Sequence, residues 1–305
     1  MVLRTTGRAF LGEAELTERE GAVLLALAGT VFSFTAVAYR AVDTANDWQF
    51  LAYRGGSTAL AMLALVALRH RSRPVDFGAT TWKAIVAGFL LAITSMLYIL
   101  ALSRISAATT LLLLAAAPVY AAVFGWLLLR ERVHSATFIA IGVTMVGVAI
   151  MVGTGLDAGS GVGLVFAMLI PILVGLYNVV LRSAPGTDPV VPALLAGVFL
   201  ALGATAAALA NGGLAVSWRD AALACVSGGV ALGIGLPLFN LGHRSVPAAR
   251  VSLLLMTEIV LAPLWVWIWP GETPRVGTLI GGAIVLAAVV WLVTKSSDSE
   301  DLLIV

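Results

Sequence analysis

The sequence predicts an all-α membrane protein of ten transmembrane helices, arranged as two inverted repeats of five helices. Its 305 residues are 60% hydrophobic and only 11% charged, with a mean hydropathy of +1.03, whereas soluble domains carry about a quarter charged residues. Apolar runs of about 20 residues, long enough to cross a bilayer, recur along almost the whole chain. The second half of the sequence also repeats the first.

The repeat emerges when the sequence is shifted by 141 positions. Small, aromatic and acidic residues then coincide, as Ala107 with Ala248, Trp126 with Trp267 and Glu131 with Glu272. A repeat of this length indicates a duplicated architecture. Because five is an odd number of spans, the second copy enters the membrane in the opposite orientation. Inverted repeats of this kind are typical of secondary transporters.

The predicted spans are separated by short breaks that contain Asp, Arg, Gly or Pro. The first repeat, residues 21–153, comprises spans 21–42, 49–69, 81–102, 106–129 and 133–153. The second repeat, residues 162–294, comprises spans 162–183, 189–210, 220–243, 246–269 and 274–294. Residues 1–20 carry four glutamates and three arginines without an apolar core, so they predict a cytoplasmic segment and not a signal peptide. Residues 295–305 are expected to form a cytoplasmic tail.

The orientation follows from the Lys and Arg residues near the ends of the spans, which favour the cytoplasmic side. With both termini inside, twelve of these residues are cytoplasmic and four lie on the opposite side. We therefore expect a multi-pass protein of the bacterial cytoplasmic (inner) membrane with both termini in the cytoplasm.

Several classes of chemistry have no signal in the sequence. There is no phosphate-binding loop for ATP, the single cysteine Cys225 lies in an apolar run, and the three histidines are isolated from one another. The net charge of +2 is too small to indicate nucleic acid as a partner. We predict no metal, no cofactor and no enzymatic activity. The expected partners are the lipid bilayer and a small-molecule substrate, with the protein as a monomer or homodimer.

Glu258 is the exceptional carboxylate, because it lies halfway along the ninth span. A charge at this depth costs at least ~2.5–3.5 kcal/mol, so it is expected to face the protein interior or a water-filled cavity. Helical spacing places Leu254 and Trp265 on the same face of the helix as Glu258. The repeat maps Leu254, Glu258, Leu261 and Trp265, in that order, onto Leu113, Ala117, Tyr120 and Phe124 of the fourth span. The alternative is a structural acid that caps a broken helix or pairs with Arg54.

Two further groups complete the predicted site. The candidate cavity-lining residues are Glu258, Leu254 and Trp265 with Ala117, Tyr120 and Phe124, joined by Tyr98, Phe239 and Asn240, which lie at corresponding places in the third and eighth spans. The candidate helix breaks are Pro118, Gly233, Gly235, Pro237 and Pro263. Interrupted helices expose backbone groups that can bind substrate, although close packing through small residues is the alternative.

The run from Ile105 to Pro118, followed by Arg130-Glu131-Arg132, resembles the EamA domain of the drug/metabolite transporter (DMT) superfamily. The stretch from Val246 to Glu258, with Gly271-Glu272 after it, resembles a second EamA copy, and Arg54 is similar to the arginine of that family's second helix. The resemblance covers residues 21–294. It implies ten helices around a central cavity and export of small metabolites by alternating access, without ATP hydrolysis. The chain looks most similar to YddG-type exporters of aromatic and other neutral amino acids.

The chain departs from the family pattern where the family often has Glu-Pro in the ninth helix. This sequence has Glu258-Ile259, with Pro263 further on, which shifts the expected break by about a turn. Two alternatives to amino-acid export remain: an uptake carrier for a nucleoside, vitamin or sugar derivative, and a non-transporting membrane scaffold or intramembrane enzyme.

Overall fold

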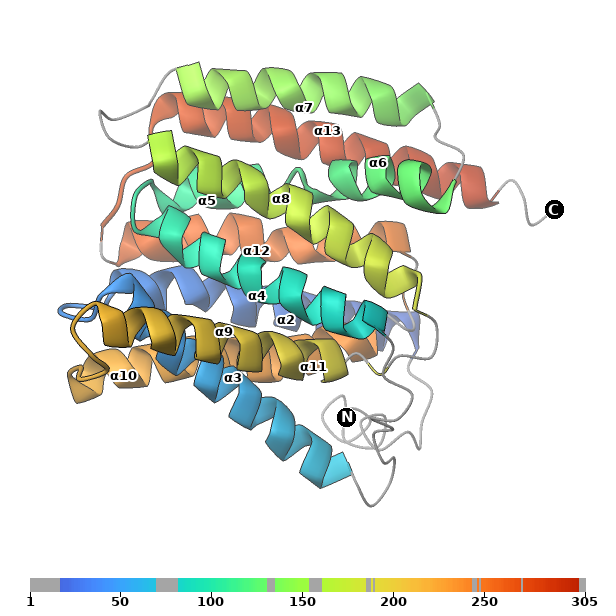
Figure 1. Ribbon diagram of the computed structural model, residues 1–305. Helices are drawn as coiled ribbons and strands as arrows, with labels where there is room; N and C mark the ends of the chain where they lie inside the picture. The colour runs from blue at the N-terminus through green and yellow to red at the C-terminus, as the bar shows by residue number, and fades with distance from the viewer. Residues whose placement is uncertain are drawn as a thin grey trace.

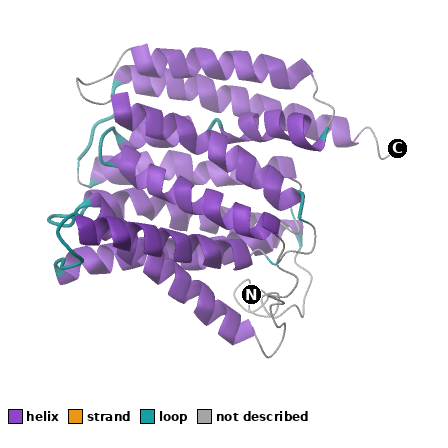
Figure 2. Ribbon diagram, in the orientation of Figure 1, coloured by secondary structure: helices purple, strands orange, loops and turns teal. Residues whose placement is uncertain are grey.

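The computed structural model describes residues 17–69, 82–130, 135–153, 161–184, 188, 190–242, 246, 248–269 and 271–301. Within these residues every regular element is a helix (Figures 1 and 2). The predicted all-α fold is therefore confirmed. Most of the predicted N-terminal segment, residues 1–16, and the last four residues of the predicted tail lie outside the described residues.

The helices follow the predicted spans within a few residues. The first repeat contains α2 (Glu18–Arg40), α3 (Asp47–Arg69), α4 (Trp82–Leu102), α5 (Ala107–Leu114), α6 (Ala117–Leu129) and α7 (Ser135–Gly153). The second contains α8 (Gly161–Arg182), α9 (Val190–Ala210), α10 (Trp218–Cys225), the π-helix η1 (Val226–Leu232), α11 (Gly233–Gly242), α12 (Ala248–Ile268) and α13 (Val276–Asp301). The last helix continues into the predicted tail as far as Asp301.

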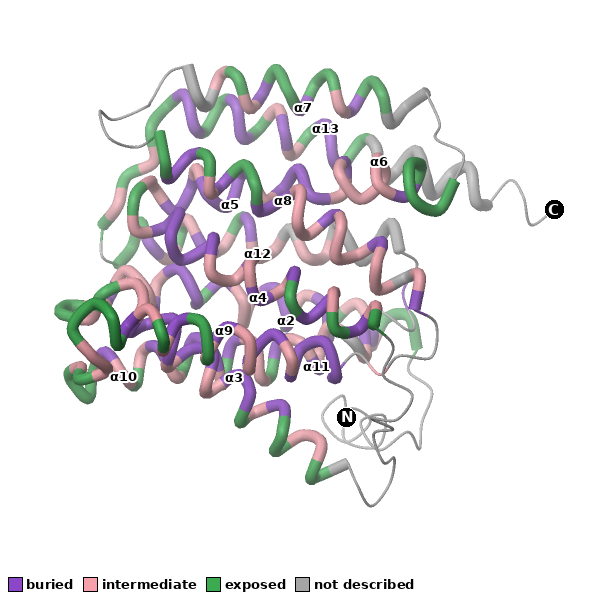
Figure 3. The backbone as a smooth tube through the Cα atoms, viewed as in Figure 1, coloured by how far each residue is buried: buried purple, intermediate pink, exposed green. Residues whose placement is uncertain are grey.

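The apolar character of the helices identifies a multi-pass membrane protein. Seven stretches of the described residues are long and apolar enough to cross a bilayer, and three shorter apolar helices accompany them. Exposed residues recur along outer helices such as α7, where they are drawn green in Figure 3. Large apolar side chains are among the exposed residues of the protein, such as Leu128 (57% exposed), Met145 (67%) and Trp267 (55%). In water these surfaces would be costly, whereas lipid tails accommodate them.

Two spans are interrupted. In the fourth span, α5 ends at Leu114 and α6 begins at Ala117, with Pro118 in its first turn, where the missing N–H of proline costs no helical hydrogen bond. In the eighth span, the π-helix η1 separates α10 from α11, which begins at Gly233. Gly235 and Pro237 lie within α11, and α12 continues through Pro263.

The packing of the helices repeats when the two halves of the chain are exchanged. Helix α3 packs against its counterpart α9, and α7 against its counterpart α13. The contact of α2 with α12 is matched by that of α8 with α5 and α6, and the contact of α4 with α8 by that of α11 and η1 with α2. Each half therefore packs mainly against the other, as expected for two repeats related by a twofold axis.

Four connections gather at one end of the bundle, which we call the polar end: those between α2 and α3, α4 and α5, α9 and α10, and α12 and α13. Arg40 Nη2 donates to the Ile105 carbonyl over 2.7 Å, and Gln49 Nε2 donates to the Gly213 carbonyl over 3.0 Å. The first of these bonds stays within the first repeat, whereas the second joins α3 to the connection between α9 and α10 and so links the two halves at the polar end.

Candidate functional site

Arg54 on α3 is buried within the bundle, with only 3% of its surface exposed. Its Nε donates to the Ser95 hydroxyl of α4 over 3.2 Å. Its Nη1 donates to the Ser227 carbonyl over 3.3 Å and also to the Ser227 hydroxyl. One arginine thus connects α3 and α4 of the first repeat with η1 of the second.

Glycines set the position of Arg54 from two sides. A Cβ at Gly228 in η1 would overlap the Arg54 carbonyl, and a Cβ at Gly55 would lie 2.5 Å from the Ala201 backbone nitrogen in α9. Both approaches are closer than any other residue permits. The π-helix that carries Ser227 and Gly228 is itself a conformation found frequently at functional sites.

Tyr98 and Glu258 belong to the same region of the bundle as Arg54. Tyr98 follows Ser95, the acceptor of the Arg54 Nε hydrogen bond, by about one turn of α4, and Glu258 is within electrostatic range of both Arg54 and Tyr98. The Tyr98 side chain is 7% exposed, and its hydroxyl has no hydrogen-bond partner in the structure. Glu258 is partly buried. Among the described residues, no ion pair within 4.0 Å joins its carboxylate to Arg54. The site therefore contains a guanidinium, a carboxyl group that is not paired with it, and an unpartnered hydroxyl.

The close approach of α2 determines where Glu258 lies. A Cβ at Gly29 would lie 3.3 Å from the Glu258 backbone nitrogen and 3.3 Å from the Thr257 Cβ, so α2 and α12 nearly touch at this level. We call Arg54, Tyr98 and Glu258 the polar triad. They come from α3 and α4 of the first repeat and from α12 of the second.

Trp265 lies about two turns beyond Glu258 on α12. Its Nε1 donates to the Ser33 hydroxyl of α2 over 3.0 Å, and its ring stacks on Phe34 with 5.5 Å between centroids. The side chain therefore contacts α2 directly. Its predicted role as a cavity-lining residue stays a prediction.

The other predicted site residues occupy different parts of the bundle. Ala117 is buried at the first residue of α6, and the Tyr120 backbone lies against α8, where a Cβ at Gly175 would come within 2.8 Å of it. Phe124 is partly buried further along α6. Phe239 and Leu254 pack on the apolar cluster of Leu25 and Val246, whereas Tyr98 belongs to the main core. The side chain of Asn240 lies outside the described part of the chain.

Ser95 and Ser227 are functional candidates that the sequence did not single out. Each is a lone serine in an apolar helix, and serine in a membrane helix is commonly a packing residue. The available signal was weak: Ser227 precedes Gly228-Gly229, a run of small residues that permits close approach of another helix. Its link to Arg54 depends on residues 173 positions apart.

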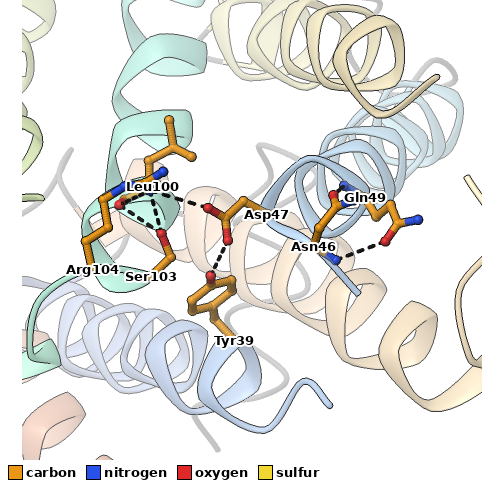
Figure 4. Close-up of polar contacts among 7 residues, drawn as sticks. All are labelled: Tyr39, Asn46, Asp47, Gln49, Leu100, Ser103 and Arg104. Atoms are coloured by element: carbon orange, nitrogen blue, oxygen red, sulfur yellow. Dashed lines mark hydrogen bonds and ion pairs between the residues drawn. The ribbon is translucent and has the colours of Figure 1, made fainter. Parts of the chain in front are cut away.

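The polar end carries a second set of charged groups (Figure 4). Asp47 at the start of α3 accepts from the Tyr39 hydroxyl over 2.5 Å and lies 3.4 Å from Arg104 Nη1. Arg104 also donates to the Leu100 carbonyl and the Ser103 hydroxyl. These contacts connect α2, α3 and α4 within the first repeat.

Glu272 and Asp220 extend this network to the second repeat. One Glu272 oxygen lies 3.0 Å from Arg40 Nε, and the other accepts from the Ala107 N–H at the start of α5 over 2.8 Å, a position where a helix favours negative charge. Asp220, 1% exposed, accepts from the backbone of residues 43–45 and from the Thr44 hydroxyl. No cluster of potential metal ligands occurs among the described residues.

Comparison of the chain with known proteins identifies its family. Residues 19–153 and 161–294 each match the EamA-like transporter family. A solved structure titled "Crystal structure of protein" superposes with a TM-score of 0.64 at 18% sequence identity, covering 89% of this chain and 97% of the other. At that identity the likeness concerns the fold alone. No curated protein matches the chain.

Proposed function

Because the chain belongs to the EamA-like transporter family, we propose that it is a secondary transporter that exports neutral amino acids, aromatic ones foremost, from the bacterial cytoplasm by alternating access. The family comprises transporters of small solutes and not enzymes. The proposed location is the inner membrane with both termini in the cytoplasm, and the proposed unit is a monomer or a homodimer.

The polar triad is the observation that carries this proposal. Ionisable residues inside membrane spans are costly, and they commonly mark substrate or ion pathways. Arg54 and Glu258 provide opposite charges that are not directly paired, and a neutral amino acid also carries one charge of each sign. The adjacent Tyr98 ring is the basis for favouring aromatic side chains.

The distribution of these residues between the repeats supports alternating access. Arg54 and Tyr98 belong to the first repeat, and Glu258 with Ser227 to the second. In transporters built from inverted repeats, one unit moves against the other around a fixed site. Such a movement would change the surroundings of a solute bound between these residues on each half-cycle.

Counterflow in liposomes tests the proposal. Liposomes that contain the purified protein are loaded with unlabelled phenylalanine, leucine or serine, and entry of labelled phenylalanine is measured. We expect exchange that is fastest with phenylalanine inside, with protein-free liposomes as the background. Absence of exchange with every amino acid, or exchange with nucleosides or sugars in their place, would contradict the proposed function.

A further inference from the structure

We infer that Arg54, Tyr98 and Glu258 form a divided binding site for a zwitterion, in which Arg54 and Tyr98 bind the carboxylate of an amino acid and Glu258 binds its ammonium group. This inference rests on the proposed function and assigns the substrate's two charged groups to particular side chains. The assignment follows from the hydrogen-bonding capacity that each residue retains.

One nitrogen of the Arg54 guanidinium, Nη2, has no acceptor among the described residues. The guanidinium carries five N–H donors, and the described partners occupy Nε, through Ser95, and Nη1, through Ser227. Among the described residues nothing accepts from Nη2. A carboxylate is the group that matches a guanidinium most closely in geometry and charge. The serines hold the side chain in place, and its remaining donors are available to an anion.

Tyr98 supplies a second donor beside the first. Its hydroxyl is buried without a hydrogen-bond partner, which is unfavourable because buried polar groups are nearly always satisfied. Tyr98 also follows Ser95, the acceptor of the Arg54 Nε hydrogen bond, by about one turn of α4. A carboxylate that bound to Arg54 Nη2 and accepted from Tyr98 would satisfy both groups at once.

Glu258 completes the site with the opposite charge. The structure gives its carboxylate no hydrogen-bond donor among the described residues, and its side chain is only partly buried. Its separation from Arg54 leaves both charges without a direct partner. A substrate with a positive group on one side and a negative group on the other would compensate both, whereas an organic anion or an amine would compensate only one.

Three related probes test this assignment. They are phenylalanine, 3-phenylpropanoate, which lacks the ammonium group, and phenethylamine, which lacks the carboxylate. Their binding to the purified full-length protein is measured by the rise in its melting temperature, and their transport by counterflow. We expect the unmodified protein to bind and exchange phenylalanine. Its affinity for each of the other two should be at least about tenfold weaker, since each leaves one polar group of the site unpaired.

Tyr98→Phe is the first variant, with Tyr53→Phe as its matched control. The Tyr53 hydroxyl already donates to the Leu214 carbonyl at the polar end. Tyr98→Phe removes a hydroxyl without a partner, so it should leave the melting temperature equal or higher and weaken phenylalanine binding about tenfold. Tyr53→Phe should instead lower the melting temperature and leave the affinity for phenylalanine unchanged. A Tyr98→Phe variant that binds phenylalanine as tightly as the unmodified protein would overturn the role of Tyr98.

Glu258→Gln is the second variant, because it retains the shape of the side chain and removes its charge. We expect it to lose its preference for phenylalanine over 3-phenylpropanoate. A preference that persists in Glu258→Gln, while the unmodified protein exchanges amino acids, would refute the divided site and leave the proposed function intact. If the unmodified protein exchanges no amino acid, the proposed function fails and the site assignment fails with it.

Discussion

Arg40 at the end of α2 and Glu272 before α13 are joined at the polar end, with 3.0 Å between Nε and Oε2. The pair fastens the first repeat to the second, and Glu272 also holds the first N–H group of α5. Movement of one repeat against the other at this end must therefore separate these groups.

Arg40→Gln is expected to make the polar end open more readily. A partly exposed ion pair contributes about 0–1 kcal/mol, so the open fraction should rise by up to about fivefold. A cysteine at Thr278, which is 3% exposed beside Thr109, reports opening through its rate of alkylation in a Cys225→Ser background. Asp47→Asn is the control, because the described side-chain bonds of Asp47, with Tyr39 and Arg104, stay within the first repeat. Equal rates in both variants would show that Arg40 does not restrain this end.

Gly228→Ala and Gly229→Ala form a matched pair in the π-helix. The first substitution places a methyl group on the Arg54 carbonyl, whereas the second places it 3.5 Å from the Ser57 Cβ, at ordinary contact. Gly228→Ala should destabilise the protein by about 1–3 kcal/mol and abolish exchange. Gly229→Ala should leave both nearly unchanged. Thermal unfolding in detergent and counterflow measure the two effects, and equal behaviour of the pair would argue against this packing.

The orientation is testable with single cysteines in the Cys225→Ser background. Asn211 lies at the polar end and Arg130 at the opposite end, and both are exposed. From the Lys and Arg bias, a cysteine at Asn211 should react with a membrane-impermeant reagent added outside cells. A cysteine at Arg130 should react only after the membrane is opened. The reverse pattern would invert the orientation, and labelling of both from one side would contradict the arrangement of the spans.

Trp265→Phe distinguishes a packing role from a substrate-binding role. Phenylalanine keeps an aromatic ring against Phe34 but loses the hydrogen bond to Ser33. If the contact with α2 is its main role, the variant should lose about 0.5–1.5 kcal/mol of stability and keep the same order of preference among amino acids. A changed order of preference in counterflow, with stability unaltered, would instead place Trp265 in the binding site.

The sequence contained most of the information needed for the fold. Apolar runs of membrane length and charged breaks located the helices, and Glu258 stood out because it interrupts such a run. The contacts of the site could not be predicted in the same way, because helical spacing defines a face but not the helix opposite it. Trp265 and Ser33 are 232 positions apart, and no local pattern links them. The π-helix also escaped prediction, since its glycines are equally compatible with a regular helix.

The partners of Arg54 have a consequence for how the protein is made. Ser95 is synthesised soon after Arg54, but Ser227 follows it by 173 positions. Until then α3 must reside in the bilayer with a charge whose insertion costs about 2.5–3.5 kcal/mol and which is only partly compensated. The nascent first half is therefore less stable in the membrane than the complete chain, in which Ser227 binds Arg54. If the gene were split between the repeats, both halves would have to be produced together.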